Sequence, residues 1–260
     1  MWQRYVAIGD STSEGLDDPD GAGGYRGWAD RFAYAVARAQ DGGLEYANLA
    51  IRGRTTARIR AEQLQAALDL APDLATVVAG MNDVLRPSFD AARIAEDVGA
   101  MQRALVAQGS TVLTFTLPDP VPVMPLARPL RGRIMALNAA LRAVTAQTGA
   151  TLLDFAAHPV ASDPRLWSDD RLHANSAGHE RIAAALAYTV GLPGTDDGWT
   201  RPLETPPRRR GHEVLRAEVA WTRRHLLPWV ARHARGRSSG DDRVCKRPVP
   251  LPVDLGDHGV

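Results

Sequence analysis

The fold is decided by a stretch near the start of the chain, Tyr5-Val6-Ala7-Ile8-Gly9-Asp10-Ser11-Thr12-Ser13-Glu14-Gly15. Its apolar first half predicts a buried strand, and its second half predicts a sharp turn. Open α/β sheets bind ligands at the carboxyl ends of their strands, so Ser11 is placed where a nucleophile is useful. The alternative is that Asp10 and Ser11 only cap the following segment, because such residues are favoured at turns and helix starts.

Short apolar runs and amphipathic helical patterns alternate through the next 180 residues. Further strands are expected at residues 44–49, 73–79, 111–117 and 151–155, and helices at residues 28–39, 56–70, 89–108, 130–147 and 174–190. This alternation predicts βαβ units, a parallel sheet and helices on both of its faces. Five prolines in residues 118–129 exclude a regular element there.

Charge is unevenly divided along the chain, although the formal net charge is only +1. Residues 1–200 carry 18 arginines and 23 acidic residues, whereas residues 201–260 carry 13 basic and 7 acidic residues, so the two parts are expected to do different jobs. A single cysteine, Cys245, excludes an internal disulfide, and no Cys/His spacing suggests zinc. No signal peptide or membrane span is recognised, which favours a cytoplasmic protein.

Residues suited to acyl transfer follow the predicted strands: Ser11, Gly53, Asn82 and the pair Asp170/His173. A serine hydroxyl needs a base to take its proton, and a carboxylate on the far ring nitrogen orients a histidine for that task. Two backbone N–H groups and the Asn82 amide could stabilise the oxyanion. Each residue also has a purely structural interpretation as a cap, a turn residue or a loop histidine. Their occurrence together at successive strand ends favours a catalytic site.

These motifs resemble the four sequence blocks of the SGNH (GDSL-type) hydrolases. The blocks are Gly9-Asp10-Ser11, Asn48-Leu49-Ala50 leading to Gly53, Gly80-Met81-Asn82-Asp83, and Asp170-Arg171-Leu172-His173 followed by Asn175 and Gly178-His179. Their order and spacing also match, and the resemblance covers roughly residues 4–190. It implies a three-layer α/β/α sandwich around a five-stranded parallel sheet, similar to flavodoxin. It also implies an esterase, lipase or deacetylase that uses no metal or cofactor.

The resemblance implies that Ser11 is the nucleophile, His173 the base and Asp170 its orienting carboxylate. Ser11, Gly53 and Asn82 become the oxyanion donors. The α/β-hydrolase alternative is rejected, because the serine is not in a Gly-x-Ser-x-Gly elbow and follows the first strand.

The sequence departs from the family pattern at two places. Thr12 stands where the family's name motif has leucine, a position that varies within the family. Arg52 and Arg54 flank Gly53 where small residues are common, which leaves the shape and charge of the pocket open.

Four residues are candidate walls of the substrate pocket: Tyr25, Trp28, Met124 and Trp167. An apolar lining favours an acyl chain, and aromatic rings also suit a sugar face, so acetylated carbohydrates are a second possibility. The alternative is that these are ordinary core residues.

The domain organisation is expected to follow the change in charge. We expect a hydrolase domain in residues 1–192, a Pro/Gly-rich linker in 193–211, an amphipathic basic helical extension in 212–235 and a disordered tail in 236–260. The extension either docks on the catalytic domain with its arginines solvated, which we favour, or lies on an anionic membrane surface. No nucleic-acid partner is expected, because the basic and aromatic residues form no recognisable module.

The expected function is that of a cofactor-free serine esterase or acylhydrolase. It would cleave a short-chain acyl, acetyl or lipid ester through an acyl-enzyme. An acyltransferase or thioesterase using the same triad is the alternative enzyme, and a catalytically silent binding protein is the alternative from another class. All the catalytic positions are filled, which argues against a silent protein.

Overall fold

The computed structural model describes residues 1–204, 216, 218–228 and 239–256, and its centre is a six-stranded sheet. The strands are β1 Arg4–Gly9, β2 Glu45–Asn48, β3 Leu74–Val78, β4 Thr111–Phe115, β5 Thr151–Leu153 and β6 Arg247–Pro252. They lie in the order β5-β4-β3-β1-β2-β6, and β1 to β5 are parallel. The five parallel strands thus have the flavodoxin-like order that the family resemblance implied.

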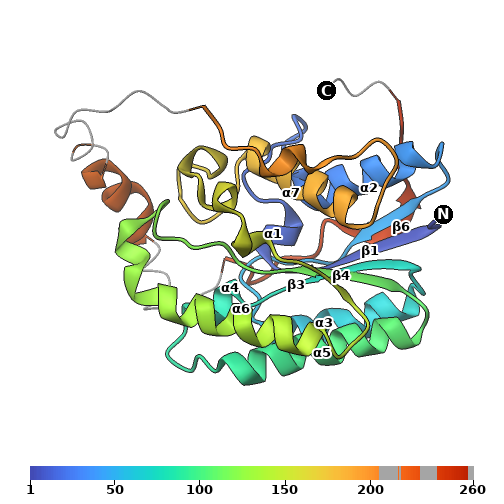
Figure 1. The fold of residues 1–260 in the computed structure, drawn as a ribbon, viewed down its shortest axis with the longest axis horizontal. Helices are drawn as coiled ribbons and strands as arrows, with labels where there is room; N and C mark the ends of the chain where they lie inside the picture. The colour runs from blue at the N-terminus through green and yellow to red at the C-terminus, as the bar shows by residue number, and fades with distance from the viewer. Residues whose placement is uncertain (205–215, 217, 229–238, 257–260) are drawn as a thin grey trace.

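Helices cover both faces of this sheet (Figure 1). The helices are α1 Ser11–Glu14, α2 Gly27–Ala39, α3 Thr56–Asp69, α4 Met81–Val84, α5 Ala91–Ala107, α6 Arg131–Thr145 and α7 Ser176–Thr189. Short 3₁₀ turns lie at Pro125–Leu130, Phe155–Ala157, Pro159–Ser162, Pro164–Leu166 and Asp197–Thr200. Helices α2 and α7 pack together on one face, and α3, α5 and α6 pack on the other. The three-layer sandwich is confirmed.

The central strand β1 is buried on both of its faces. Tyr5 and Ala7 pack in the core beneath α2 and α7, whereas Val6 and Ile8 pack in the core beneath α3, α5 and α6. Successive side chains of a strand point to opposite faces, so a strand covered on both sides reads as a continuous apolar run. The uninterrupted run before the Ser11 turn is explained in this way.

The order of the strands reverses next to β1. The chain passes from β1 to β2 on one side, and then returns to form β3 on the other side of β1. In open α/β sheets the crevice beyond the carboxyl ends at such a reversal is the usual ligand site. Ser11 follows β1 and Asn82 lies just after β3, so the topology brings both residues to this crevice.

The sixth strand corrects the expected disorder of residues 236–260 for the part that the structure describes, residues 239–256. Strand β6 pairs antiparallel with β2 at the sheet edge, where its prolines are tolerated because an edge strand need not donate every hydrogen bond. The Arg247 guanidinium lies over the Tyr46 ring, 5.1 Å from its centroid, and its Nε donates to the Tyr46 carbonyl at 2.7 Å. Lys246, the only lysine of the chain, donates to Asp30 at 2.6 Å. Composition predicts disorder here, but it does not reveal these partners.

The expected linker and helical extension lie partly outside the described residues. Residues 218–228 are helical, with a π-helical turn at Thr222–Leu226, and they appear in orange-red at the left of Figure 1. Among the residues that the structure describes, no helix is both long enough and apolar enough to cross a membrane.

Candidate active site

Ser11 is held at the end of β1 by a turn made of tightly packed backbone. It is the first residue of α1, and the Asp10 side chain caps this short helix by accepting a hydrogen bond from the Thr12 backbone N–H at 3.0 Å. Gly15 ends the helix with φ +94°, and a Cβ there would lie 2.6 Å from the Gly27 Cα. Only glycine therefore fits this close approach of the turn to the start of α2.

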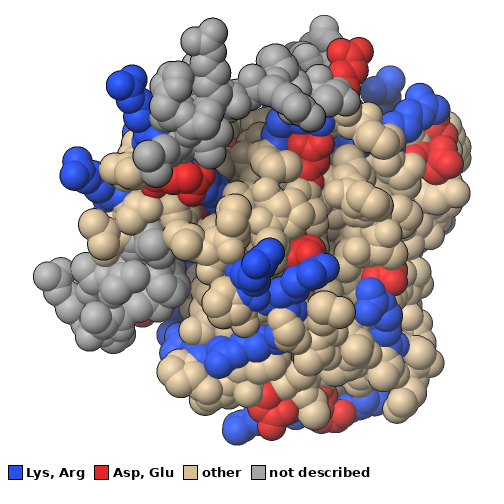
Figure 2. Space-filling view, turned by 60° about the vertical axis from the view of Figure 1, so that its left-hand side comes forward, with Lys and Arg blue, Asp and Glu red and all other residues tan. Residues whose placement is uncertain are grey.

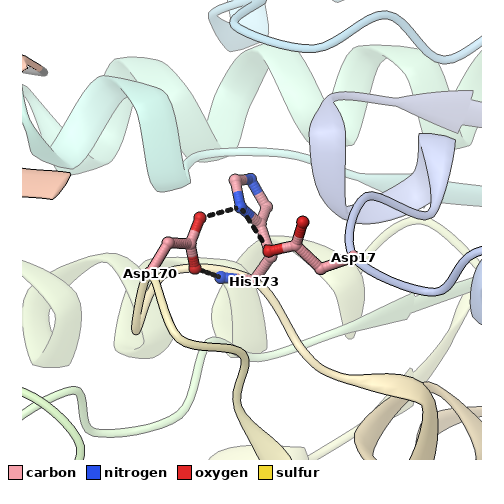
Figure 3. Close-up of side chains that lie close together, drawn as sticks. All are labelled: Asp17, Asp170 and His173. Carbon is pink, nitrogen blue, oxygen red and sulfur yellow. Dashed lines mark hydrogen bonds and ion pairs between the residues drawn. The ribbon is translucent and has the colours of Figure 1, made fainter. Parts of the chain in front are cut away.

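His173 connects Ser11 with Asp170. Its Nε2 lies 2.9 Å from the Ser11 Oγ, and its Nδ1 lies 2.6 Å from the Asp170 Oδ2. The second oxygen of Asp170 accepts backbone N–H bonds from Leu172 at 2.9 Å and from His173 at 3.0 Å. The loop between β5 and α7 thus orders the carboxylate and the ring together, and Figure 3 shows Asp170 against the ring nitrogen.

Electrostatics adjusts this pair for proton transfer. Burial alone would lower the pKa of His173, but the hydrogen bond and negative charge of Asp170, with smaller contributions from Asp17 and Asp10, raise the pKa above its ordinary value of 6.5. Burial alone would raise the pKa of Asp170, but hydrogen bonds from His173 and Ser168 hold it well below its usual range. An imidazole between an ionised carboxylate and a hydroxyl is suited to act as a base.

A second carboxylate, Asp17, lies on the other side of the same ring nitrogen (Figure 3). Its Oδ2 is 3.8 Å from the His173 Nδ1. The Ser168 Oγ lies 2.5 Å from Asp17 and 2.6 Å from Asp170, and its single proton can be donated to only one of them at a time. Asp17 and Ser168 were not among the predicted site residues, because no spacing pattern relates either of them to His173.

Asp17, Asp170 and His173 also offer ligand atoms within 4.8 Å of one another, which is close enough to share a metal ion. Both ring nitrogens of His173, however, have hydrogen-bond partners in this arrangement, Asp170 and Ser11. The three groups are therefore explained as a hydrogen-bonded network. The absence of a metal from the reaction stays a prediction.

Asn82 lies at the start of α4, after β3, and its amide points back toward the Ser11 turn. The Nδ2 donates to the Asp10 Oδ2 at 2.9 Å and to the Arg54 carbonyl at 3.1 Å. Burial raises the pKa of Asp10 to about 6. Both amide hydrogens are engaged within the protein, so Asn82 can serve an oxyanion only by sharing or giving up one of these bonds.

Gly53 lies between two arginines that fix its loop. Arg52 donates from its backbone N–H to Glu14 at 2.7 Å and from Nε at 2.9 Å, and Arg54 donates to Glu62 at 2.6 Å. Gly53 has φ +72°, a conformation that favours glycine. The sequence did not decide whether Arg52 and Arg54 add positive charge to the pocket. Both are paired with carboxylates, and Arg54 is buried.

All five candidate catalytic and oxyanion residues line one cleft of about 1070 Å³: Ser11, Gly53, Asn82, Asp170 and His173. Its walls also include apolar side chains, among them Ile94 and Leu130, and basic side chains, among them Arg86 and Arg93. Figure 2, which turns the left-hand side of Figure 1 toward the viewer, shows Lys and Arg side chains set among uncharged residues on this face. The cleft can therefore accept a substrate with both apolar and polar parts.

The four predicted pocket walls lie in different places. Met124 lines the large cleft, and Trp167 lines a second, apolar cavity of about 40 Å³ beside His173. The Tyr25 ring lies under the Arg52 guanidinium, 5.3 Å from it. The prediction that Trp28 lines the pocket is wrong, because its side chain is fully buried in the core under α2 and α7 and has no surface to offer a substrate.

His179, the second histidine of the fourth motif, has a structural position. Its Nδ1 accepts from the Trp28 backbone N–H at 3.0 Å, and its Nε2 bonds the Leu16 carbonyl at 2.9 Å. Burial lowers its pKa to about 4, which keeps the ring neutral and able to make both bonds. His179 thus ties α7 to α2 and to the loop after Ser11.

Comparisons with known proteins identify the family of the chain. A family model described as the GDSL-like Lipase/Acylhydrolase family matches residues 7–181. The chain therefore belongs to this family, and it is a hydrolase that acts on ester bonds. No curated protein matches the chain.

Several solved structures share the fold. TesA is 26% identical with a TM-score of 0.58, over 73% of this chain and 98% of its own. LAE5, described as an alpha/beta hydrolase enzyme from the metagenome of Lake Arreo, is 22% identical with a TM-score of 0.60, over 74% and 97%. A catalytic mutant of Axe2, an acetylxylan esterase from Geobacillus stearothermophilus, is 20% identical with a TM-score of 0.57, over 75% and 97%.

Proposed function

We infer that the chain hydrolyses carboxylic esters through a covalent acyl-enzyme on Ser11. His173 takes the proton of the Ser11 hydroxyl as this oxygen attacks the ester carbonyl, and Asp170 stabilises the imidazolium that results. The observation that carries this proposal is the double contact of His173, 2.9 Å to Ser11 and 2.6 Å to Asp170.

The proton that His173 takes from Ser11 is passed on in the later steps, and Ser11 is protonated again at the end. The imidazolium of His173 gives its proton to the departing alcohol, which leaves Ser11 acylated. A water molecule attacks the acyl-enzyme while His173 accepts a proton from it, and collapse of the second intermediate releases the carboxylic acid and returns the proton to Ser11. No metal or cofactor is required for any of these steps.

The negative charge that develops on the carbonyl oxygen needs donors placed in advance. We assign this role to the backbone N–H groups of Ser11 and Gly53 and to the side-chain amide of Asn82. All three residues line the same cleft. In this proposal the oxyanion replaces or shares the bond that Asn82 makes to Asp10 or to the Arg54 carbonyl.

The two cavities suggest how an ester is accommodated. The cavity beside His173 and Trp167 has a volume of only about 40 Å³, so of the common acyl groups it suits the shortest, such as acetyl. The large cleft has room for a much larger alcohol, sugar or lipid portion. A short-chain or acetyl ester is therefore the substrate that we propose. An acyltransferase or thioesterase would use the same groups and differ in the acceptor or the leaving group.

The proposal is tested with p-nitrophenyl esters of increasing acyl length. We expect wild-type turnover to be highest for the shortest acyl chains, and Ser11→Ala to lower kcat by roughly a million-fold. Ser162→Ala is the control, because Ser162 is half-buried like Ser11 but lies outside the residues that line the cleft. Full activity of Ser11→Ala in folded protein would contradict the proposal.

Two finer predictions go with this function. Cytoplasmic location is still a prediction. Contact of the C-terminal extension with a membrane surface is also still a prediction. The contacts of Arg171 with Glu218 and Trp221 support the docked alternative.

A further inference from the structure

The helical segment 218–228 contacts the loop that carries Asp170 and His173. Arg171, the residue after Asp170, donates from both terminal nitrogens to Glu218, at 2.8 and 2.7 Å. Its guanidinium also lies over the Trp221 ring, 4.7 Å from the centroid. Planar, two-pronged pairing with a carboxylate together with stacking on a ring is the interaction for which arginine is best suited. These contacts dock the segment on the active-site loop.

Arg171 occupies a backbone conformation that agrees with this docking role. It is one of the few non-glycine residues with a positive φ, +63°. Such a conformation costs free energy and is kept where surrounding contacts hold it. The Trp221 Nε1 also lies 3.4 Å from the Asp170 carbonyl oxygen, a long contact that brings the ring to the catalytic carboxylate's own backbone.

The docked segment forms part of the substrate cleft. Trp221, Arg224, His225 and Pro228 line the same cleft as Ser11. Trp221 is only 7% exposed, although it lies outside both core clusters. The ring therefore offers the cleft only a small exposed apolar part, but neighbouring residues hold that part rigidly in place.

A second C-terminal stretch contacts the opposite active-site loop. The Gly240 carbonyl accepts a hydrogen bond from Arg54 Nη1 at 3.1 Å, and a Cβ on Gly240 would lie 1.8 Å from the Arg52 carbonyl oxygen. Gly240 therefore lies directly against the loop that carries Gly53. Residues 218–228 and Gly240 both follow residue 181, where the family match ends. This chain thus adds its own contacts to both active-site loops.

We propose that Trp221, held in place by the Arg171–Glu218 pair, is a specificity-determining residue that binds a large apolar group of the ester substrate. The proposal rests on ester hydrolysis at Ser11. The ring fixes one wall of the cleft next to the Asp170 loop, so its removal weakens binding of substrates that extend along that wall. Small esters, which do not reach it, depend on it less.

Three esters test this assignment. p-Nitrophenyl acetate has no long apolar group, p-nitrophenyl octanoate has one on the acyl side, and octyl acetate has one on the alcohol side. We expect Trp221→Ala to lower kcat/KM about tenfold or more for at least one long-chain ester, mainly through KM, and less than about threefold for p-nitrophenyl acetate. Glu218→Gln should lower kcat/KM for the same long-chain ester by about threefold. Trp221→Leu, which keeps apolar bulk, should give a smaller loss than Trp221→Ala.

Two control variants make the same substitutions, Trp to Ala and Glu to Gln, away from the cleft. Trp199 is also 7% exposed but packs in the core under α7, and Glu45 forms an Arg–Glu pair with Arg4 at the amino ends of β1 and β2. Trp199→Ala and Glu45→Gln should leave the ratios of kcat/KM among the three esters unchanged. An equal loss on all three esters with Trp221→Ala, or no change on either long-chain ester, would overturn the proposal.

A binding measurement separates this proposal from the proposed function. Titration of octyl acetate into Ser11→Ala protein, with and without Trp221→Ala, reports binding without turnover. We expect a Kd about tenfold higher in the double variant if the apolar alcohol lies on Trp221. If the wild-type protein is inactive but this difference in Kd is found, ester hydrolysis is contradicted and the binding role of Trp221 is supported. Equal Kd values, together with an unchanged ratio of kcat/KM between p-nitrophenyl octanoate and p-nitrophenyl acetate, would refute the proposed role of Trp221.

Discussion

The two halves of the active site are positioned in different ways. The Ser11 turn is held mainly by close backbone packing, in addition to the hydrogen bonds of Asp10: it follows a strand buried on both faces, and Gly15 lies against Gly27 with no room for a side chain. The Asp170–His173 loop is half-buried and is held by side chains, among them Ser168 and Arg171. The proposed nucleophile is therefore positioned mainly by the fold itself, whereas the proposed base and its carboxylate are positioned by side-chain contacts within their loop and with residues 218–228.

This difference separates stability from activity. Changes in the Ser11 turn should disturb the packing of the sheet and helices, because tightly packed interiors tolerate little added volume. Changes in the loop should alter catalysis while most of the fold is kept. The following predictions test this contrast, from the largest expected effect to the smallest.

Among the variants that compare the two halves, Asp170→Asn should have the largest effect, a loss in kcat of roughly 10⁴-fold with little loss of stability. The amide cannot stabilise the imidazolium and favours the wrong tautomer of His173. Asp169→Asn is the matched control, because Asp169 is its exposed neighbour in the same loop. Steady-state kinetics on a p-nitrophenyl ester gives the comparison. A loss of less than about tenfold, against that expectation, would remove Asp170 from the triad.

Asn82→Ala should lower kcat by roughly 10²- to 10³-fold, the usual loss when one oxyanion donor is removed. The substitution also removes the Asn82 donor from the buried Asp10 carboxyl, which still accepts from the Thr12 N–H, so thermal unfolding should be measured beside the kinetics. A loss below about threefold would show that Asn82 serves only to hold Asp10 and the Arg54 carbonyl.

Gly15→Ala should lower the free energy of unfolding by about 2 kcal/mol or more, which is roughly 4–8 °C in Tm for a domain of this size. The new methyl group meets backbone at 2.6 Å and the residue keeps φ +94°. Gly21→Ala is the control: its φ is +82°, but nothing lies within 4 Å of the added carbon. Similar losses in the two variants would mean that strain, and not close packing, dominates at the Ser11 turn.

The sequence predicted the features that depend on local patterns. The strand-end positions of Ser11, Gly53 and Asn82 follow from a regular alternation of strands and helices, and the three-residue spacing of Asp170 and His173 places them in one turn. The resemblance to a family supplied the strand order. These are properties of short stretches or of known motifs.

The features that were missed depend on contacts between distant residues. Asp17 approaches His173 across 156 positions of sequence, and β6 is ordered by the β2 edge and by side-chain partners far away in the chain. Trp28 lies on the apolar face of a helix, and only the packing of that helix shows that its ring is in the core and not in the pocket. The contact of Glu218 with Arg171 is likewise invisible in any local pattern.

The central claim is that Ser11 is a nucleophile activated by His173. The most direct measurement is covalent labelling with a fluorophosphonate, followed by mass spectrometry of the modified peptide at a series of pH values. We predict a single adduct on Ser11, whose rate of formation rises with pH through a midpoint above 6.5, because only neutral His173 accepts the proton and its pKa is raised. An adduct on another residue, or a rate on Ser11 that does not change over this pH range, would contradict the account.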